Sequence, residues 1–182
     1  MSQFAEVECA IRQLHARYVD AVWRKDSASF GALFADDAEW RVGGQVMRGR
    51  AAIVAFIKGA FPLYRRILMT FRTPVVDLMP DGTAVARTYV TENSLFADGT
   101  PFAPIGIYFD RFVEVDGRWL FSWRMFQTHY IGEPDLRGEW FDMPEYGPPP
   151  GMPPLDEVTF DRSGTGATAT GQGAPCSRRS PT

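Results

Sequence analysis

The stretch KDSASFGALFADDAEWRVGG, residues 25–44, joins a helical pattern to a strand pattern and decides the fold. Asp26 is a typical N-cap residue, so it is expected to start a short helix with Phe30 and Phe34 on its inner face. Because Asp favours helix ends and turns, the FADDA segment is expected to close that helix. The next residues, EWRVGGQVMRG, alternate around a Gly43-Gly44 turn, which predicts a small hairpin.

Helical patterns lie on both sides of this stretch. Upstream, apolar residues four, three, four and four positions apart form one helical stripe. The stripe consists of Val7, Ile11, Leu14, Tyr18 and Val22. Downstream, Gly49 is expected to open a third helix that ends near Pro62, with Ile53, Phe56, Ile57 and Ala60 facing inward. The chain is therefore predicted to begin with three helices.

The following residues read as strands. Four β-rich runs are separated by Asp-Gly turn signals: residues 67–79, 83–96, 104–115 and 118–131. Helices followed by consecutive antiparallel strands are typical of the α+β class. We expect a cone in which the three N-terminal helices pack in a strongly curved antiparallel sheet, leaving a pocket inside.

The composition changes near residue 146. Residues 147–182 hold seven of the fourteen prolines and six of the seventeen glycines. Such a segment is typical of a stiff linker followed by disorder. We therefore expect one domain over residues 1–145 and a disordered tail over residues 146–182.

Charge and hydropathy exclude several classes of partner. The net charge is −3 and the pI is about 5.4, which argues against nucleic acid or an anionic membrane. No apolar run approaches the roughly 20 residues of a membrane span, and the N-terminus lacks a signal-peptide pattern. A cytoplasmic protein is expected. The heavy aromatic load, with fourteen Phe, five Trp and six Tyr, indicates a large core or an apolar pocket.

Metal and cofactor chemistry has little support in the sequence. Cys9 and Cys176 imply no disulfide framework, and the only histidines are His15 and His129. No HExxH or CxxC spacing occurs, so we expect neither a metal nor a cofactor.

Three segments carry a family resemblance: RYVDAVWRKDSASFGALFADDAEWRVGG with RGRAAIVAFI, then PDGTAVARTYV, then GIYFDRFVEVDGRWLFSWR. Over residues 5–132 the chain resembles the SnoaL-like branch of the nuclear-transport-factor-2-like superfamily. The resemblance implies a cone-shaped scaffold with a pocket for a hydrophobic small molecule. That scaffold hosts polyketide cyclases, dehydratases, a dehydrochlorinase, ketosteroid isomerase, oxygenase subunits and carriers, so it does not settle the activity.

The resemblance also says which working residues are replaced. The dehydratases and the dehydrochlorinase use an Asp on the first helix and a His on the first long strand. Ungapped matching puts Trp23 and Thr70 at those positions, and neither can take a proton from carbon at neutral pH. The base of ketosteroid isomerase falls near Val42, whereas its oxyanion-holding Tyr matches Tyr18.

Other family positions define the candidate site. The resemblance gives Trp40, Tyr108, Asp110 and Arg124 as pocket residues. In an unbulged hairpin, Asp110 would lie opposite Trp123, but a single bulge would bring Asp110 and Arg124 onto one face. A structural salt bridge and a functional pair both remain open. Tyr18 is either a core tyrosine or a donor to a substrate oxygen.

The remaining candidates follow from position. Arg72 shares strand parity with Thr70 and would suit an anionic or carbonyl-bearing ligand if it points inward. His129 lies at the end of the last strand as a surface residue or a base, and His15 is expected at the edge of the buried stripe. Glu39 and Trp40 should lie on opposite faces of a strand, with Glu39 solvated.

The favoured function is a cofactor-independent lyase or isomerase acting on a hydrophobic cyclic or polyketide-like molecule, in a homodimer or homotrimer. Asp110 or His129 would move the proton. Three residues would stabilise oxyanion charge: Tyr18, Tyr108 and Arg124. The ligand-binding candidates are Trp23, Trp40, Phe56, Thr70 and Arg72. The alternatives are a non-catalytic binder of an apolar ligand, or an accessory subunit of a biosynthetic or oxygenase complex.

Overall fold

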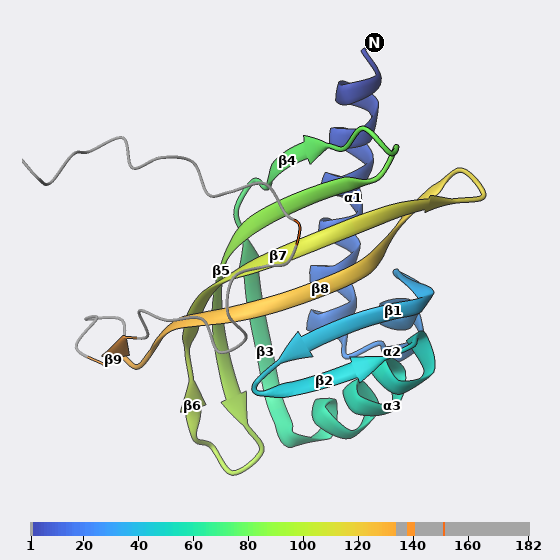
Figure 1. Cartoon of the computed structure of the whole chain (residues 1–182). Coiled ribbons are helices and arrows are strands. Elements are labelled where there is room, and N and C mark those ends of the chain that lie inside the picture. The colour runs from blue at the N-terminus through green and yellow to red at the C-terminus, as the bar shows by residue number, and fades with distance from the viewer. Residues whose placement is uncertain (1, 134–137, 141–150, 152–182) are drawn as a thin grey trace, which may run out of the picture.

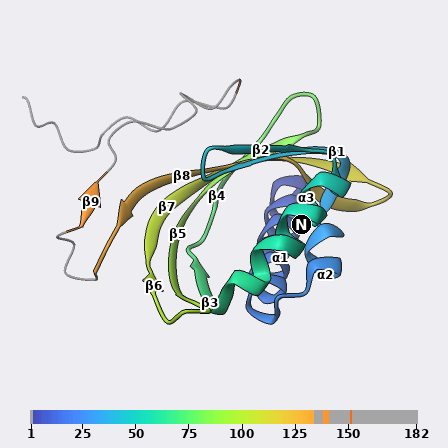
Figure 2. The same cartoon turned by 90° about the horizontal axis from the view of Figure 1, so that it is seen from below.

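Three helices and a curled sheet make up the chain in a computed structural model, which describes residues 2–133, 138–140 and 151 (Figure 1). The helices are α1 (Gln3–Arg24), α2 (Ser27–Gly31) and α3 (Arg50–Ala60), followed by a short 3-10 turn, η1 (Phe61–Leu63). Seen from below, the sheet curls around α1 and α3 (Figure 2). The expected α+β cone with three N-terminal helices is confirmed.

The sheet contains nine strands within the described residues. They are β1 (Phe34–Val42), β2 (Gln45–Arg48), β3 (Tyr64–Phe71), β4 (Val75–Leu78), β5 (Ala84–Phe96), β6 (Pro101–Phe102), β7 (Pro104–Val115), β8 (Arg118–Ile131) and β9 (Glu139–Trp140). Their main order is β2-β1-β8-β7-β5-β3. One feature differs from the purely antiparallel sheet that was expected: β1 runs parallel to β8, so the sheet is mixed. Parallel pairing needs a long crossover, which here is everything between β1 and β8.

Helix α1 forms as its periodicity predicts. The Ser2 side chain caps its N-terminus by accepting from the amide of Ala5, and Lys25 ends it in the left-handed conformation. All five residues of the predicted apolar stripe are buried. Asp26 then caps α2, as expected, by accepting from the amides of Ala28 and Ser29.

The FADDAEW segment is strand throughout, so the expectation that FADDA closes a helix was wrong. α2 ends at Gly31, and the carbonyl of Leu33 already accepts from the amide of Phe121 in β8. Pairing with a distant strand therefore overrides the local preference of aspartate for turns. The register with β8 shifts between Phe34 and Glu39, and both Asp36 and Asp37 in this interval are exposed.

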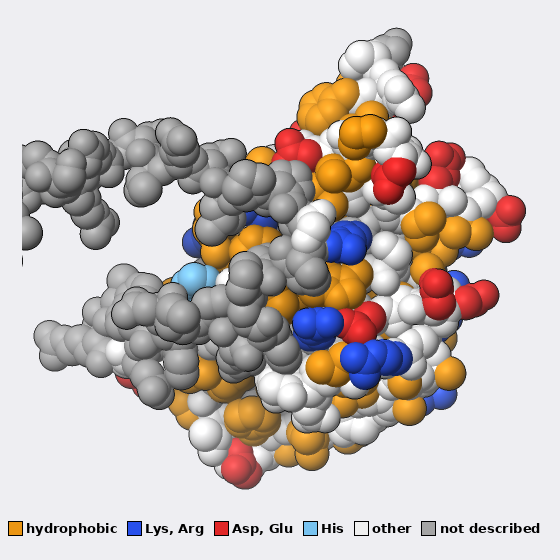
Figure 3. All heavy atoms as spheres, viewed as in Figure 1, with side chains coloured by type: hydrophobic (Ala, Val, Ile, Leu, Met, Phe, Trp, Pro, Cys, Tyr) orange, Lys and Arg blue, Asp and Glu red, His pale blue; other side chains and the backbone are white. Residues whose placement is uncertain are grey.

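Glu39 and Trp40 do lie on opposite sides of β1, but Glu39 is not solvated. Its carboxylate accepts from Arg41 at 2.6 Å and from the indole of Trp123 at 3.1 Å, and it lies 2.9 Å from Arg48. Figure 3 shows basic side chains gathered around an acidic one over β1 and β2. On the outer face of β1, Glu39 is therefore held by side chains of β1, β2 and β8.

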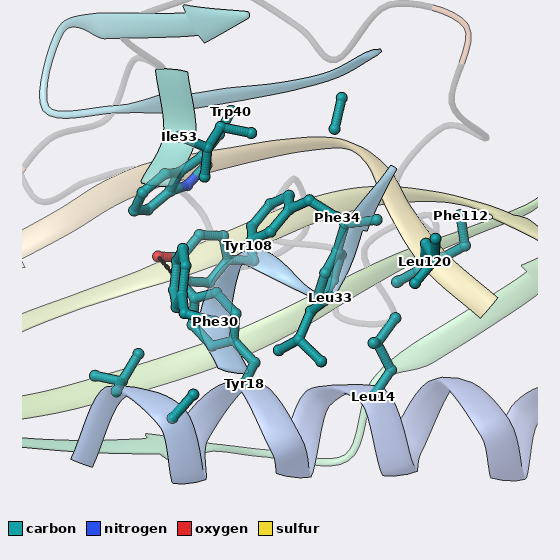
Figure 4. Packing of buried hydrophobic residues seen from close by; sticks show 14 of the residues in the cluster. Leu14, Tyr18, Phe30, Leu33, Phe34, Trp40, Ile53, Tyr108, Phe112 and Leu120 are labelled. Atoms are coloured by element: carbon teal, nitrogen blue, oxygen red, sulfur yellow. Dashed lines mark hydrogen bonds between the residues drawn. The ribbon is translucent and has the colours of Figure 1, made fainter. Parts of the chain in front are cut away.

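The core lies between α1 and the concave face of the sheet. Figure 4 shows Tyr18 rising from α1 to meet Phe30 and Tyr108, with Phe34 and Trp40 beyond them. The ring centroids of Tyr18 and Phe30 are 4.8 Å apart, within the range of favourable aromatic pairs. Aromatic contacts thus connect α1 to α2 and to β7.

A bulge sets the register of the β7–β8 hairpin. The pairing shifts between Arg111 and Phe112, and Asp110 consequently lies opposite Arg124. The structure therefore confirms the bulged alternative and excludes the unbulged one, in which Asp110 would face Trp123. Both charged side chains point to the concave face.

A second register shift lies between Ile105 and Gly106, where the backbone of β7 comes close to that of β8. This close approach can be tested by substitution. A Cβ at residue 106 would lie 2.3 Å from the carbonyl oxygen of Gln127 and 2.5 Å from the ring of Phe126. Gly106→Ala is expected to lower the free energy of unfolding by about 1–3 kcal/mol, the usual cost of overpacking.

The matched control for this prediction is Gly59→Ala in α3, where a Cβ would meet nothing within 4 Å. This change is expected to stabilise by about 0.4–1 kcal/mol through the unfolded chain. Urea denaturation of both variants measures the change in the free energy of unfolding, which should be negative for Gly106→Ala and positive for Gly59→Ala. Equal effects would contradict the close approach at Gly106.

The structure does not test the expected domain boundary at residue 145 or the expected tail. Both lie outside the described residues, apart from Gly151. Within the described part of the chain, no helix is long and apolar enough to cross a membrane.

Candidate functional site

A cavity of about 260 Å³ opens between the concave face of the sheet, α1 and α3. Its wall is mostly aromatic and aliphatic, which suits an apolar ligand. The wall includes Tyr18, Val22, Trp40, Phe56, Tyr64, Met69, Glu92, Phe102, Tyr108 and Phe126. Glu92 is the one acidic or basic residue among the described residues that line it.

Two tyrosine hydroxyls meet at this wall. Tyr18 from α1 and Tyr108 from β7 bring their hydroxyl oxygens to 3.3 Å, within hydrogen-bond distance. Burial raises the pKa of both phenols, that of Tyr18 well above its usual value. Both groups therefore stay protonated at neutral pH, and the pair retains a hydroxyl proton that it can donate to a ligand oxygen.

The Arg124 guanidinium lies directly behind the two tyrosines. It is fully buried, and its carbon lies 3.7 Å from the ring centroid of Tyr108 and 4.1 Å from that of Tyr18. Phe121 contributes a third ring at 4.3 Å. The positive charge is held by aromatic faces, an arrangement that strengthens when water is excluded. It also lowers the pKa of both phenols and so opposes part of the effect of burial.

Asp110 neutralises Arg124 from the side away from the cavity. Its Oδ1 is 3.5 Å from Arg124 Nε, and its Oδ2 is 3.0 Å from His15 Nε2. Burial lowers the pKa of His15, although hydrogen bonding to Asp110 opposes the shift. His15 is therefore neutral, with Nε2–H donating to the carboxylate. The cluster of His15, Asp110 and Arg124 therefore lies behind the tyrosine pair, and the three guanidinium nitrogens of Arg124 are buried without a hydrogen-bond partner among the described residues.

The expected place of His15 at the edge of the buried stripe was wrong. His15 is fully buried against β7, because Asp110 gives its ring a polar partner inside the core. His129 is half-buried near the end of β8 and is not among the residues of the cavity wall.

Glu92 was missed by sequence reasoning. It lies on β5 and projects from the cavity wall, and the Ser94 hydroxyl donates to its Oε1 at 2.5 Å. Burial raises the pKa of its carboxyl group, and the hydrogen bond from Ser94 opposes the shift. Strand alternation contained the signal: Ala84, Ala86, Thr88 and Val90 are all buried, so Glu92 continues the same inward row.

Apart from His129, the predicted site residues fall into three groups. Tyr18, Trp40, Phe56 and Tyr108 line the cavity. Asp110 and Arg124 lie behind that wall. Trp23, Thr70 and Arg72 line a different, open groove between α1 and β3, together with Arg12, His15 and Pro74.

Trp23 and Thr70 line the groove because each lies one residue away from a residue that lines the cavity. Trp23 is 50% exposed and its indole donates to the carbonyl of Met69 at 2.8 Å. The neighbouring residues Val22 and Met69 line the cavity, and Met69 also borders the groove. Adjacent residues of a strand point to opposite faces, and adjacent residues of a helix are about 100° apart. Ungapped matching therefore identified the outward neighbour in both elements.

The wall offers acid–base and hydrogen-bonding groups but little for a metal. Within the described part of the chain, no group of three His, Cys, Asp or Glu side chains could hold a metal ion. The available acid–base chemistry is that of one carboxyl group and three phenols, those of Tyr18, Tyr64 and Tyr108, in a mostly apolar surrounding.

Comparison with known proteins agrees with this architecture. The model of the SnoaL-like domain family matches residues 3–125, so the chain belongs to that family. A search of curated proteins finds no match.

Two solved structures illustrate the similarity. A hexachlorocyclohexane dehydrochlorinase, LinA type 2, is 18% identical and superposes with a TM-score of 0.67, covering 81% of this chain and 97% of its own. ActVI-ORFA from Streptomyces coelicolor is 20% identical with a TM-score of 0.59, covering 68% of this chain and 97% of its own. At such identity the likeness establishes the fold alone.

Proposed function

We propose that this protein is a cofactor-independent lyase or isomerase that acts on a hydrophobic cyclic or polyketide-like carbonyl compound. The observation that carries the proposal is the Tyr18–Tyr108 hydroxyl pair at the wall of an apolar cavity, with the Arg124 cation behind it. Donors already held in a water-poor site stabilise a developing oxyanion without having to reorganise. The name of the dehydrochlorinase with the same fold describes an elimination, which agrees with this class.

The proposed reaction begins with a substrate carbonyl at the tyrosine pair. Loss of a proton from the adjacent carbon moves an electron pair toward the carbonyl oxygen. The two hydroxyls hydrogen-bond to the resulting enolate. The positive charge of Arg124, which lies against the two tyrosine rings, stabilises the negative charge of the enolate. The enolate then either expels a leaving group from the next carbon or takes a proton at another carbon.

A test uses 1-tetralone in D₂O, with no cofactor added, and follows deuterium entry beside the carbonyl by NMR. Tyr108→Phe keeps the ring over Arg124 but removes one hydroxyl. The expected result is a loss of about 100-fold or more in the catalysed exchange rate, the usual effect of deleting an oxyanion donor.

The matched control is Tyr89→Phe, because Tyr89 is an exposed tyrosine on β5. It should exchange at the wild-type rate. If Tyr108→Phe also exchanges at that rate, or if the wild-type protein gives no acceleration, the proposed reaction is excluded.

A non-catalytic binder is the second candidate, and Val22 and Met69 favour it. The nearest residues to the family's Asp and His positions that face the cavity are these two apolar side chains. A carrier needs only such an apolar wall and a few polar anchors. Mass spectrometry of small molecules retained by the purified protein distinguishes the candidates, because a carrier returns its ligand unchanged after incubation.

Self-association through the sheet and an accessory role in a larger complex stay predictions from sequence. The molar mass of the purified protein in solution tests both, since a homo-oligomer assembles without a second kind of chain.

A further inference from the structure

We propose that the Glu92 carboxylate is the group that takes the proton from the substrate and returns it, and that the substrates are uncharged cyclic ketones. This inference rests on the proposed function and adds to it the missing base. Neither the Asp110 nor the His129 position supplies that base at the cavity wall.

The first support is that Glu92 shares the cavity with the tyrosine pair. Glu92 and Thr88 lie on the same face of β5, and Thr88 is paired with Tyr108 in β7. The carboxylate and the phenol are also close enough to interact electrostatically. Burial is the main cause of the raised pKa of Tyr108, and the negative charge of Glu92 adds to the shift. A ligand whose carbonyl lies at the tyrosines is therefore within reach of a base on the same wall.

The second support is the difference between the two buried carboxylates of this cone. Asp110 is fully buried, does not line the cavity and is held by His15 and Arg124. Glu92 remains partly accessible through the cavity, with Ser94 as a hydrogen-bond donor. A base must reach the proton that it removes, so access favours Glu92.

The surroundings of Glu92 also suit the task. The titratable groups that face the cavity from other elements are Tyr18 on α1, Tyr64 on β3 and Tyr108 on β7, all neutral phenols. Burial raises the pKa of Tyr64 to about 12, with a smaller contribution from the charge of Glu92. The raised pKa of Glu92 itself makes its carboxylate a stronger base than a solvated one.

The substrate class follows from charge and size. Among the described residues of the wall, none carries a positive charge, and ionised Glu92 would repel an anionic substrate in this apolar space. A volume of about 260 Å³ holds a small ring system rather than a long chain. An uncharged cyclic ketone satisfies both conditions.

The proton step balances without a further reagent. The carbon–hydrogen bond beside the carbonyl breaks, its proton passes to a Glu92 oxygen, and its electron pair forms the enolate held by Tyr18 and Tyr108. In D₂O, a solvent deuteron replaces the proton on Glu92, and its delivery to the original carbon gives exchange. Return of the proton to another carbon gives isomerisation. In elimination the leaving group departs with its electron pair, and the proton on Glu92 passes to the leaving group or to water.

The decisive variant is Glu92→Gln, which preserves shape and removes the base. In the 1-tetralone exchange assay, the catalysed rate is expected to fall by about 100-fold or more. Binding of 2-naphthol, a planar phenol that resembles the enolate, should persist in the same variant when followed by fluorescence. Glu114→Gln is the matched control, because Glu114 is exposed at the end of β7.

A second readout needs no substrate. Because burial raises the pKa of Glu92, the folded state holds its proton to higher pH than the unfolded state does. The free energy of unfolding therefore falls as pH rises from the ordinary carboxyl pKa through the raised one. Glu92→Gln should be more stable than wild type at about pH 8 and equal to it at about pH 4, as measured by urea denaturation.

Each outcome separates this inference from the proposed function. Exchange at the wild-type rate in Glu92→Gln, or no gain in its stability at the higher pH, overturns the role of Glu92. Loss of exchange in Glu92→Gln together with full activity in Tyr108→Phe supports Glu92 and rejects the tyrosine pair. A wild-type protein that does not accelerate the exchange rejects both.

Discussion

Replacing Arg124 by methionine is expected to lower the free energy of unfolding by about 3–5 kcal/mol, the usual cost of breaking a buried ion pair from one side. Arg124 is fully buried, and methionine fills much of its volume. What the variant loses is the charge beside Asp110 and the contacts with the rings of Tyr18 and Tyr108. Asp110 would then stay buried with His15 as its remaining partner.

A double variant tests this explanation. In Asp110→Leu with Arg124→Met, no charge is left uncompensated, so the loss should be smaller than that of Arg124→Met alone. Arg12→Met serves as a surface control, since Arg12 is exposed and forms a pair with Glu8 at 3.7 Å that is expected to contribute less than about 1 kcal/mol. Urea denaturation measures all three. A double variant that loses as much stability as Arg124→Met alone, or more, would contradict the buried-pair account.

The second large effect is expected for Phe121→Ala, with a loss of about 3–5 kcal/mol. Phe121 has no exposed surface, and its ring centroid lies 5.3 Å from that of Phe34 and 5.2 Å from that of Phe112. Its ring also covers the Arg124 guanidinium. Truncation removes apolar contact area and leaves a cavity beneath the cluster of His15, Asp110 and Arg124.

Two further variants make the Phe121 result specific. Phe121→Leu keeps most of the volume and should cost less than about 1.5 kcal/mol, as conservative core changes do. Phe4→Ala, at a position that is 46% exposed, should stay within about 0.5 kcal/mol of wild type. Equal losses for Phe4→Ala and Phe121→Ala would contradict the central place of Phe121 in the core.

These two variants bear on function because the same residues support the proposed oxyanion site. Arg124 and Phe121 contact the tyrosine pair from the side opposite the cavity, so they act on a ligand through Tyr18 and Tyr108. Under the proposed function, stability and oxyanion binding would therefore be linked in this cone, whereas Glu92 lies at the cavity wall and its burial disfavours its ionised form.

The sequence by itself determined the helices, most of the strands and the α+β class. The stripe along α1, the Asp26 cap and the Gly43-Gly44 turn depend on neighbours within a few residues, and each forms as expected. Periodicity and capping are local properties, so they can be read without knowing what packs against them. The family resemblance added the cone and identified Tyr18 and Tyr108.

The tertiary structure alone decided where the polar groups meet. The bulge after Arg111 pairs Asp110 with Arg124, and long-range packing buries His15 beside them. Pairing of β1 with β8 turns FADDAEW into a strand, and one-residue steps put Val22 and Met69, not Trp23 and Thr70, at the cavity. A shift of a single residue reverses the face of a strand, and such shifts depend on contacts between segments far apart in the chain. The row that carries Glu92 was visible in the alternation of β5, but only the curled sheet gives that row a cavity to face.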